Sequence, residues 1–206
     1  MSAFDSIVEA DHKLFFCLNE SHQPWLDNVM VALSSKILWI PLYAWMLYLI
    51  YKKYGKGTLV ILLCTAGLIF FSDQTANVFK ELVQRYRPTH NPTFGNLVHT
   101  VHDYRGGVYG FFSSHASNAF AIIMFVLLLL KSTKPWFKLI LISYACLTSY
   151  SRIYLGVHYP SDILVGAGCG IGLGFLFYNF TKVLLDYFLL PIQKWEEPNC
   201  ILQILT

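Results

Sequence analysis

The sequence predicts an all-α fold, a polytopic membrane bundle of about five transmembrane helices preceded by one interfacial helix. Apolar residues make up 55% of the 206 residues and charged residues only 13%, a balance that ordinary soluble domains do not show. Several apolar runs approach the roughly 20 residues that a helix needs to cross the bilayer core. The length fits a single domain over residues 1–206. The net charge of +3 and the lack of a basic arm give no indication of nucleic-acid binding.

An amphipathic helix is expected first, over residues 3–19. Phe4, Ile7 and Phe15 recur at helical spacing, and acidic residues such as Glu9 occupy the other face. A helix with this pattern lies in the membrane interface rather than crossing the bilayer.

Five spanning helices are then expected, over residues 26–51, 58–84, 114–131, 136–153 and 160–189. A basic turn from Tyr51 to Gly57 separates the first two. The second begins as a purely apolar helix, but Asp73, Asn77 and Lys80 fall on one face of its last part. A polar stripe on an apolar helix is expected to face the bundle rather than lipid.

Proline and serine define the boundaries of the middle helices. Pro88 disfavours helical geometry at the residue before it, so the second span should end there and a long active-site loop should cover residues 85–113. Ser113 or Ser114 is a suitable N-cap for the third span. Pro135 is placed to open the fourth.

The last span carries glycines at four-residue spacing. It is expected to open at Pro160, and its glycines form two series, Gly166, Gly170, Gly174 and Gly168, Gly172. Small residues at this spacing let helices approach closely in lipid. We therefore interpret the glycines as packing positions rather than as a phosphate-binding loop.

Lysine and arginine are separated along the chain. The lysines of two short turns, which the helix count places on one side of the membrane, are Lys52, Lys53, Lys56, Lys131, Lys134 and Lys138. An excess of basic residues in short loops marks the cytoplasmic side. The four arginines fall on the opposite side, namely Arg85, Arg87, Arg105 and Arg152. Because the planar guanidinium group suits phosphate oxygens, this side is expected to hold an anion site.

Three polar clusters lie on the arginine side, at the edges of apolar segments. They are Lys80 with Arg87-Pro88, then Ser113-Ser114-His115, and then Arg152 with His158 and Asp162. Ionisable residues within membrane spans are costly and indicate function by default. Several cations beside two imidazoles and a carboxylate predict a site that handles phosphate.

These clusters resemble the three-part signature of the type 2 phosphatidic acid phosphatase superfamily. The matching pattern is Lys80-x6-Arg87-Pro88, Ser113-x-His115 and Ser151-Arg152-x5-His158-x3-Asp162. The superfamily also includes bacterial lipid phosphatases, glucose-6-phosphatase and vanadium haloperoxidases, so the resemblance implies their helical core. The second part departs from the family pattern, since Phe112 and Ser114 stand where Pro and Gly are usual.

The resemblance implies a role for each matched residue. His158 would be the nucleophile that forms a phosphohistidine, Asp162 would orient it, and His115 would be the general acid and base. The residues expected to bind the substrate phosphate are Lys80, Arg87, Ser113, Ser114 and Arg152. His90 and Arg105 of the loop are possible head-group contacts. No cofactor or metal is expected, because the cations already neutralise the phosphoryl group.

The resemblance also suggests a substrate and a location. The expected activity is hydrolysis of a phosphomonoester or diphosphate of an amphiphilic lipid, with undecaprenyl diphosphate as first choice. Lipid A, dephosphorylated at position 1 or 4', and phosphatidylglycerophosphate are the alternatives. The expected location is the bacterial cytoplasmic (inner) membrane, with the site on the periplasmic or outer face. The lipid in the bilayer is the only partner expected, and no obligate protein partner is inferred.

Other interpretations of these residues remain open. A membrane transporter could bind an anion with the same cations and no chemistry, although no inverted halves are visible. A haloperoxidase-like protein would be soluble, and a metal site at the two histidines lacks zinc-type spacing. His90, His99 and His102 are more simply loop residues, and Asp73 could pair with Lys80 inside the bundle. The five scattered cysteines are interpreted as small core residues.

Overall fold

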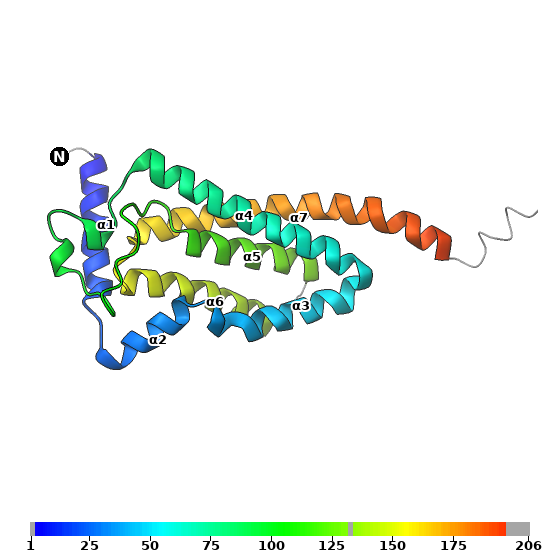
Figure 1. Cartoon of the computed structure of the whole chain (residues 1–206), viewed down its shortest axis with the longest axis horizontal. Helices are drawn as coiled ribbons and strands as arrows, with labels where there is room; N and C mark the ends of the chain where they lie inside the picture. Colours follow the sequence, from blue (N-terminus) through cyan, green and yellow to red (C-terminus); the bar gives the residue numbers. More distant parts are fainter. Residues whose placement is uncertain (1–2, 132–133, 197–206) are drawn as a thin grey trace, which may run out of the picture.

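The computed structural model describes residues 3–131 and 134–196 and shows an elongated helical bundle (Figure 1). Its α-helices are α1 (Ala3–Asn19), α2 (Pro24–Ser34), α3 (Ile40–Tyr54), α4 (Thr58–Val83), α5 (Ser114–Leu130), α6 (Pro135–Tyr154) and α7 (Pro160–Glu196). Short 3-10 turns lie at η1 (Ile37–Trp39), η2 (Gly55–Gly57), η3 (Pro88–His90) and η4 (Gly95–Leu97). Within the described ranges the only β-type pairing is one isolated bridge. The predicted all-α class is therefore confirmed.

Two helical stretches of the described chain are long and apolar enough to cross a membrane. They are Ile37–Val83, which contains the α3–α4 hairpin, and Pro160–Tyr187 in α7. Ser114–Leu130 is a shorter apolar helix. These stretches support a membrane protein, while the count of five spanning helices stays a prediction.

The helix expected over residues 26–51 is interrupted, and this expectation was wrong. α2 ends at Ser34 and α3 begins only at Ile40. Ser35 has extended backbone angles, and its hydroxyl accepts a hydrogen bond from the backbone N–H of Ile37 at 3.2 Å. Serine competes in this way with helical hydrogen bonding. The carbonyl of Leu33, left free at the end of α2, accepts instead from the indole Nε1 of Trp39 at 2.9 Å.

The last helix is longer than expected. The helix predicted to end at residue 189 continues to Glu196, through Pro191. Proline removes one helical hydrogen bond without necessarily ending a helix. The sequence predicts an interfacial or cytoplasmic tail from Pro191 onward; residues 191–196 belong to α7, and the rest of that tail lies outside the described residues.

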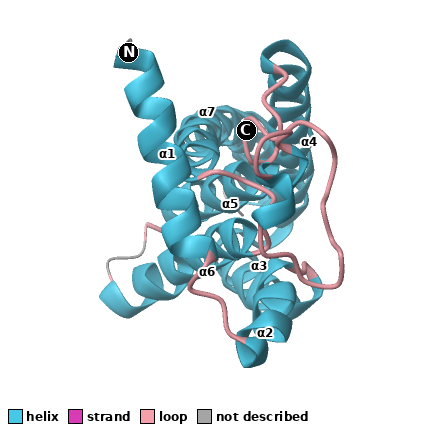
Figure 2. Cartoon of the chain, turned by 90° about the vertical axis from the view of Figure 1, so that its left-hand side faces the viewer, coloured by secondary structure: helices cyan, strands magenta, loops and turns pink. Residues whose placement is uncertain are grey.

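α5 occupies the middle of the bundle, with α3, α4, α6 and α7 around it (Figure 2). Its closest neighbour is α7, because one glycine series faces it. A Cβ atom added at Gly166, Gly170 or Gly174 would lie 2.7, 2.2 or 2.5 Å from a backbone oxygen of α5 or its N-cap. No atom of another element lies within 4 Å of such a Cβ at Gly168 or Gly172. The predicted packing role is thus confirmed for the first series only.

The lysine-rich turns and the arginines lie at opposite ends of the bundle, as the sequence predicts. The η2 turn and the C-terminal end of α5 lie at one end, and α1 with the 85–113 loop lies at the other (Figure 1). At the lysine end, Lys53 donates from Nζ to the carbonyl oxygen of Leu129 at 2.7 Å. This lysine therefore satisfies an orphan carbonyl at the end of α5.

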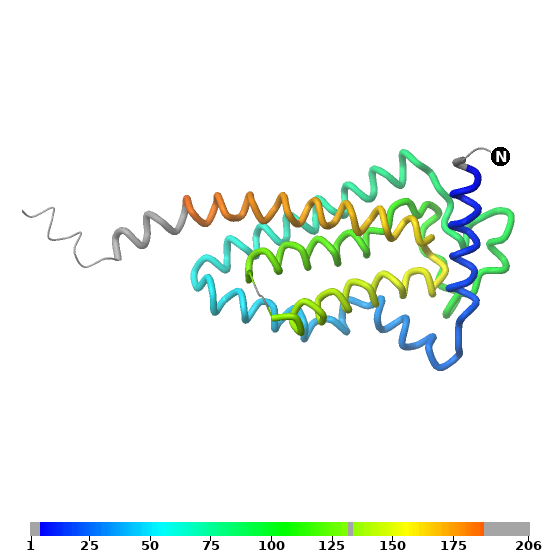
Figure 3. Tube along the Cα trace, turned by 180° about the vertical axis from the view of Figure 1, so that it is seen from behind, coloured from blue at the N-terminus to red at the C-terminus, as the bar shows by residue number. Residues whose placement is uncertain are grey.

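α1 lies across the opposite end of the bundle (Figure 3). Phe15 is fully buried there and packs with Tyr159 and Ile163 at the start of α7. Asn19, 1% exposed, donates from Nδ2 to the carbonyl oxygen of Tyr154 at 2.8 Å and accepts from the N–H of His99 at 2.9 Å. α1 is thus bound to the end of α6 and to the long loop.

Candidate active site

A backbone bridge brings Arg87 from its loop into the bundle. Tyr86 pairs with Tyr109, which closes the base of the 85–113 loop. The guanidinium Nε of Arg87 donates to the carbonyl oxygen of Tyr109 at 3.1 Å, and the residue is 9% exposed. Burial, together with the neighbouring Arg152 charge, lowers the pKa of Arg87. Two guanidinium groups this close favour a bound anion.

The turn between α6 and α7 places His158 beside Asp162. Gly156 has φ +72°, and an added Cβ would lie 2.6 Å from Val98 Cγ1, so the tight turn requires glycine there. Asp162 Oδ2 accepts from the N–H of Tyr159 at 3.0 Å and lies 3.4 Å from Nδ1 of His158. That contact falls short of a hydrogen bond, and Nδ1 has no other partner. Catalytic hydrogen bonds are often long in the absence of substrate.

His158 is 2% exposed and Asp162 is fully buried. Burial, reinforced by the charges of Arg87 and Arg152 and opposed by Asp162, lowers the pKa of His158 to about 4. The imidazole is therefore neutral near neutral pH, and its unprotonated nitrogen can act as a nucleophile.

Arg152 is held by two side chains that the sequence did not single out. Its Nη1 donates to the hydroxyl of Ser34, and its Nη2 donates to the hydroxyl of Tyr104 at 3.1 Å. Arg152 is 4% exposed, and its Nε has no hydrogen-bond partner. An unpartnered buried donor of this kind is available to an oxyanion. Burial raises the pKa of Tyr104, but the charge and hydrogen bond of Arg152 outweigh it and lower that pKa overall.

The N-terminal end of α5 brings the second motif against the first and third. Ser113 caps α5 by accepting from the N–H of Ala116 at 3.4 Å, and its own N–H donates to the carbonyl oxygen of Asp162 at 3.1 Å. Lys80 donates from Nζ to the hydroxyl of Ser114 at 2.6 Å. Ser114, at the position where the family usually has Gly, thus supplies an acceptor for the lysine.

The residue considered as a structural partner of Lys80 bonds elsewhere. Asp73 Oδ1 accepts from Nδ2 of Asn118 at 2.8 Å. Phe112, at the position of the usual Pro, is fully buried, and its ring centroid lies 5.4 Å from that of Phe79. Two residues of the polar stripe of α4, Asp73 and Lys80, thus contact α5 as predicted, whereas Asn77 is exposed.

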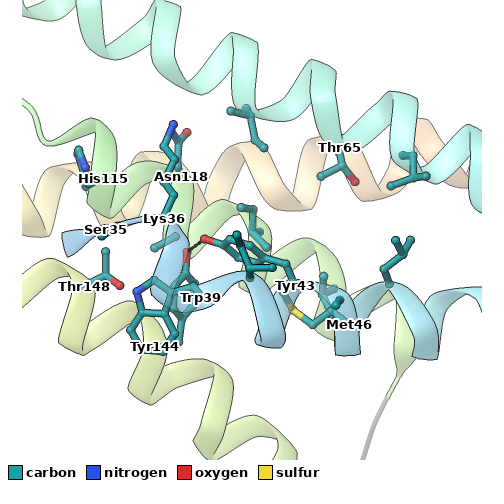
Figure 4. Close-up of a pocket in the computed structure, with 18 of the residues that line it drawn as sticks. Ser35, Lys36, Trp39, Tyr43, Met46, Thr65, His115, Asn118, Tyr144 and Thr148 are labelled. Carbon is teal, nitrogen blue, oxygen red and sulfur yellow. Dashed lines mark hydrogen bonds between the residues drawn. The ribbon is translucent and has the colours of Figure 1, made fainter. Parts of the chain in front are cut away.

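His115 lies in the wall of two cavities. It is close enough to Arg87, Arg152 and His158 to interact with them electrostatically. One cavity, of about 480 Å³, runs from His115 between α3, α4, α5 and α6 and is lined mainly by apolar side chains (Figure 4). The other, of about 430 Å³, is lined by residues that include Tyr104 and Arg152.

The three motifs thus meet at one end of the bundle, on the arginine side, as the sequence predicts. A family model described as the PAP2 superfamily matches residues 57–185. The chain belongs to the PAP2 superfamily.

Several PAP2 proteins are similar over most of their length. A protein named lipid A 4'-phosphatase from Bacteroides thetaiotaomicron is 39% identical over 188 residues, covering 89% of this chain and 81% of the relative. One named undecaprenyl-diphosphatase from Sulfolobus acidocaldarius is 31% identical over 190 residues, covering 90% and 82%. The crystal structure of a transmembrane PAP2 type phosphatidylglycerolphosphate phosphatase from Bacillus subtilis superimposes with a TM-score of 0.64 at 25% identity, covering 86% and 87%. The chain is thus a phosphatase of this PAP2 family, and its relatives differ in the lipid that they are named for.

Two histidines of the 85–113 loop, His99 and His102, contact residues outside the three motifs. His99 Nε2 lies 3.1 Å from Asp27 Oδ1, and the His99 ring stacks on His22 at 3.7 Å. His102 Nε2 lies 3.3 Å from Asn28 Oδ1. These contacts agree with the interpretation of His99 and His102 as loop residues.

The two possible head-group residues, His90 and Arg105, lie near each other and contact Thr89. His90 is half-buried, and its Nδ1 lies 3.3 Å from the hydroxyl of Thr89. Burial and the charges of Arg87 and Arg105 lower the pKa of His90. Arg105 is exposed, and its carbonyl oxygen accepts from Thr89 at 3.0 Å. Contact of either residue with a head group stays a prediction.

Proposed function

We propose that this protein removes phosphate from a lipid in the bilayer through a phosphohistidine formed at His158. The observation that supports this most directly is the burial of His158 and Asp162 close to Arg87 and Arg152. His115 is near enough to interact electrostatically with His158 and with both arginines. Phosphate-ester hydrolysis is very slow without catalysis, so a site must stabilise the charge on the phosphoryl oxygens. The guanidinium groups and Lys80 supply that stabilisation.

In the first step, Nε2 of His158 attacks phosphorus. A P–N bond forms while the bond from phosphorus to the lipid oxygen breaks. His115 gives its proton to that oxygen, so the lipid leaves as a neutral alcohol or, from a diphosphate, as a lipid monophosphate. Asp162 orients the imidazole through Nδ1, as a carboxylate does in a nucleophile–base–orienter arrangement.

In the second step, His115 accepts a proton from water and the hydroxide attacks phosphorus. The P–N bond breaks, inorganic phosphate is released, and His158 is neutral again. General acid–base catalysis of this kind contributes about 10²–10⁴-fold. We infer that no metal takes part, because Lys80, Arg87 and Arg152 provide the positive charge.

A lipid substrate is supported by the apolar cavity that begins at His115. It extends along α3 and α4, which are joined at η2 and diverge toward the site (Figure 1). A chain lying in this cavity would place its phosphate at the arginine end. We propose that this end faces the periplasm or the outside of the bacterial cytoplasmic membrane, because the lysine-rich turns lie at the other end.

Two substrate classes are proposed, a lipid A phosphate and undecaprenyl diphosphate. The names of the Bacteroides and Sulfolobus relatives support one each. The classes differ in the leaving group, which is a sugar hydroxyl in the first and a lipid phosphate in the second. Phosphatidylglycerophosphate is a third member of the test panel.

The test is phosphate release by the purified protein from these three lipids, with and without a chelator. We expect release that the chelator does not change. His158→Ala should fall to background and His115→Ala by about 10²–10⁴-fold. His22→Ala, an exposed loop histidine, is the control and should keep full activity. Acid-labile phosphate on the wild-type chain, absent from His158→Ala, would identify the intermediate.

A transporter that only binds the anion would give a different result. It would release no phosphate, and His158→Ala would leave binding unchanged. Full activity in either active-site variant would refute the roles given to these histidines.

A further inference from the structure

An ion-pair chain connects the N-terminal helix to the carboxylate beside His158. Asp11 of α1 is 9% exposed, and its Oδ2 accepts from Nη2 of Arg85 at 2.6 Å. The same guanidinium donates from Nη1 to Oδ1 of Asp162 at 2.9 Å. Arg85 therefore bridges two buried carboxylates from different elements.

Ser161 forms hydrogen bonds with both Asp11 and Arg85. Its N–H donates to Asp11 Oδ1 at 2.9 Å, and its hydroxyl donates to Asp11 Oδ2 at 2.5 Å. Nη1 of Arg85 also donates to that hydroxyl at 2.6 Å. Asp11 thus accepts hydrogen bonds at the start of α7, where a carboxylate is favoured by the helix dipole.

An aromatic cluster fixes the plane of the guanidinium. The Cζ atom of Arg85 lies 4.0 Å from the ring centroid of Tyr159, the neighbour of the proposed nucleophile. The same ring also contacts α1, with His12 at 5.0 Å and Phe15 at 5.5 Å between centroids. α1 therefore packs against both the ion-pair chain and the residue next to His158.

Arg85 does not point toward the proposed phosphate position. Both of its terminal nitrogens are taken by Asp11, Ser161 and Asp162. Oδ1 of Asp162 accepts from Arg85, whereas Oδ2 accepts from the N–H of Tyr159 and lies beside Nδ1 of His158. The orientation of the Asp162 carboxylate, and with it the imidazole, therefore depends on where Arg85 is held.

We propose that Asp11 and Arg85 are positioning residues, through which α1 holds the Asp162–His158 pair in its reactive orientation. This inference rests on the proposed phosphohistidine chemistry. It makes the interfacial helix part of the catalytic assembly, although none of the proposed phosphate-binding residues belongs to α1. Breaking the chain leaves Lys80, Arg87 and Arg152 in place, so substrate binding should persist while the chemical step slows.

The test compares kcat, KM and thermal stability of full-length variants on a lipid phosphate that the wild type hydrolyses. Arg85→Lys keeps the charge, but one ammonium group cannot reproduce the planar fork that spans Asp11 and Asp162. We expect kcat to fall by about 10–100-fold in Arg85→Lys and in Asp11→Asn, the range found for residues that orient metal-ligating side chains. KM should stay within about twofold of wild type, since the phosphate cations are untouched.

The matched control is Glu9→Gln in the same helix. Glu9 forms an exposed pair with Lys13 at 2.7 Å, and such pairs contribute little. This variant should keep wild-type kcat and KM. In Arg85→Ala, millimolar guanidinium should restore part of kcat, because the side chain is 22% exposed and its site is reachable.

Three results would overturn the proposal. One is unchanged kcat in Arg85→Lys and Asp11→Asn. Another is a rise in KM with kcat unchanged, which would place α1 in substrate binding. The third is a loss of activity that follows the loss of folded protein and does not respond to guanidinium. Failure of the proposed function is distinct, since the wild type itself would then release no phosphate.

Discussion

The contact between α5 and α7 predicts opposite effects for two neighbouring glycine-to-alanine changes. A Cβ at Gly170 would lie 2.2 Å from the backbone oxygen of Ser117 and 3.0 Å from the backbone nitrogen of Ala121. Backbone atoms within a helix cannot rotate away. The two helices must therefore separate by about 1 Å to reach an ordinary C···O contact of about 3.3–3.6 Å.

Gly170→Ala should lower the free energy of unfolding, because the added methyl group overpacks the contact between α5 and α7. Extra methyl groups in a packed interior destabilise by about 1–3 kcal/mol. Replacing glycine by alanine in a helix gains up to about 1 kcal/mol from propensity. Gly168→Ala should show only the gain in helix propensity, because no atom of another element lies within 4 Å of its added Cβ. Since the propensity gain is common to both, Gly170→Ala should be less stable than Gly168→Ala by about 1–3 kcal/mol.

Thermal unfolding in detergent micelles measures this difference, which corresponds to about 2–4 °C in Tm for each kcal/mol. Gly170→Ala should also lose activity, because α5 and α7 carry His115 and Asp162, and a displacement of about 1 Å can cost about 10²-fold in rate. Equal melting temperatures for the two variants, or a more stable Gly170→Ala, would refute this account of the helix contact.

Two further predictions concern the site. Gly110→Ala should lose most activity, because the added Cβ would lie 2.9 Å from Arg87 Cγ and 3.6 Å from His158 Nδ1. In the control Gly107→Ala, the added Cβ has no atom within 4 Å, so activity should be retained. Similar rates in both variants would contradict the packing described. Burial lowers the pKa of His158 to about 4 in the folded protein, whereas in the unfolded chain it is about 6.5. Between these two pH values His158 is protonated in the unfolded chain but not in the folded protein, which favours unfolding. Stability should therefore fall by roughly 3 kcal/mol across that window, and chemical denaturation at several pH values should show a shallower fall in His158→Gln.

The sequence was sufficient to predict the convergence of the three motifs. Charged residues such as Lys80 and Arg152 stand out against apolar surroundings, and their position relative to the helix ends requires them to share one side. The same reasoning predicted the amphipathic α1 and the close α5–α7 contact, because both depend on regular spacing. Regular patterns were therefore the reliable part of the prediction.

Contacts made by irregular segments could not be predicted in the same way. Ser34 and Tyr104 hold Arg152, yet neither belongs to a periodic pattern. The break after α2 lies at Ser34-Ser35-Lys36, a polar stretch too short to end the apolar run on hydropathy alone. Asp11 belongs to the polar face of an amphipathic helix, where exposure is the ordinary expectation. Its burial depends on Arg85, a pairing across 74 residues that no local signal encodes.

The position of His115 in the wall of two cavities has a consequence for product release. If this imidazole protonates the departing oxygen, the lipid product is already in the apolar cavity and can diffuse back sideways into its leaflet. The freed phosphate remains on the side of Tyr104 and Arg152 and can exit toward water through the other cavity. The two products then have separate routes, so the lipid that leaves in the first step does not obstruct release of the phosphate in the second.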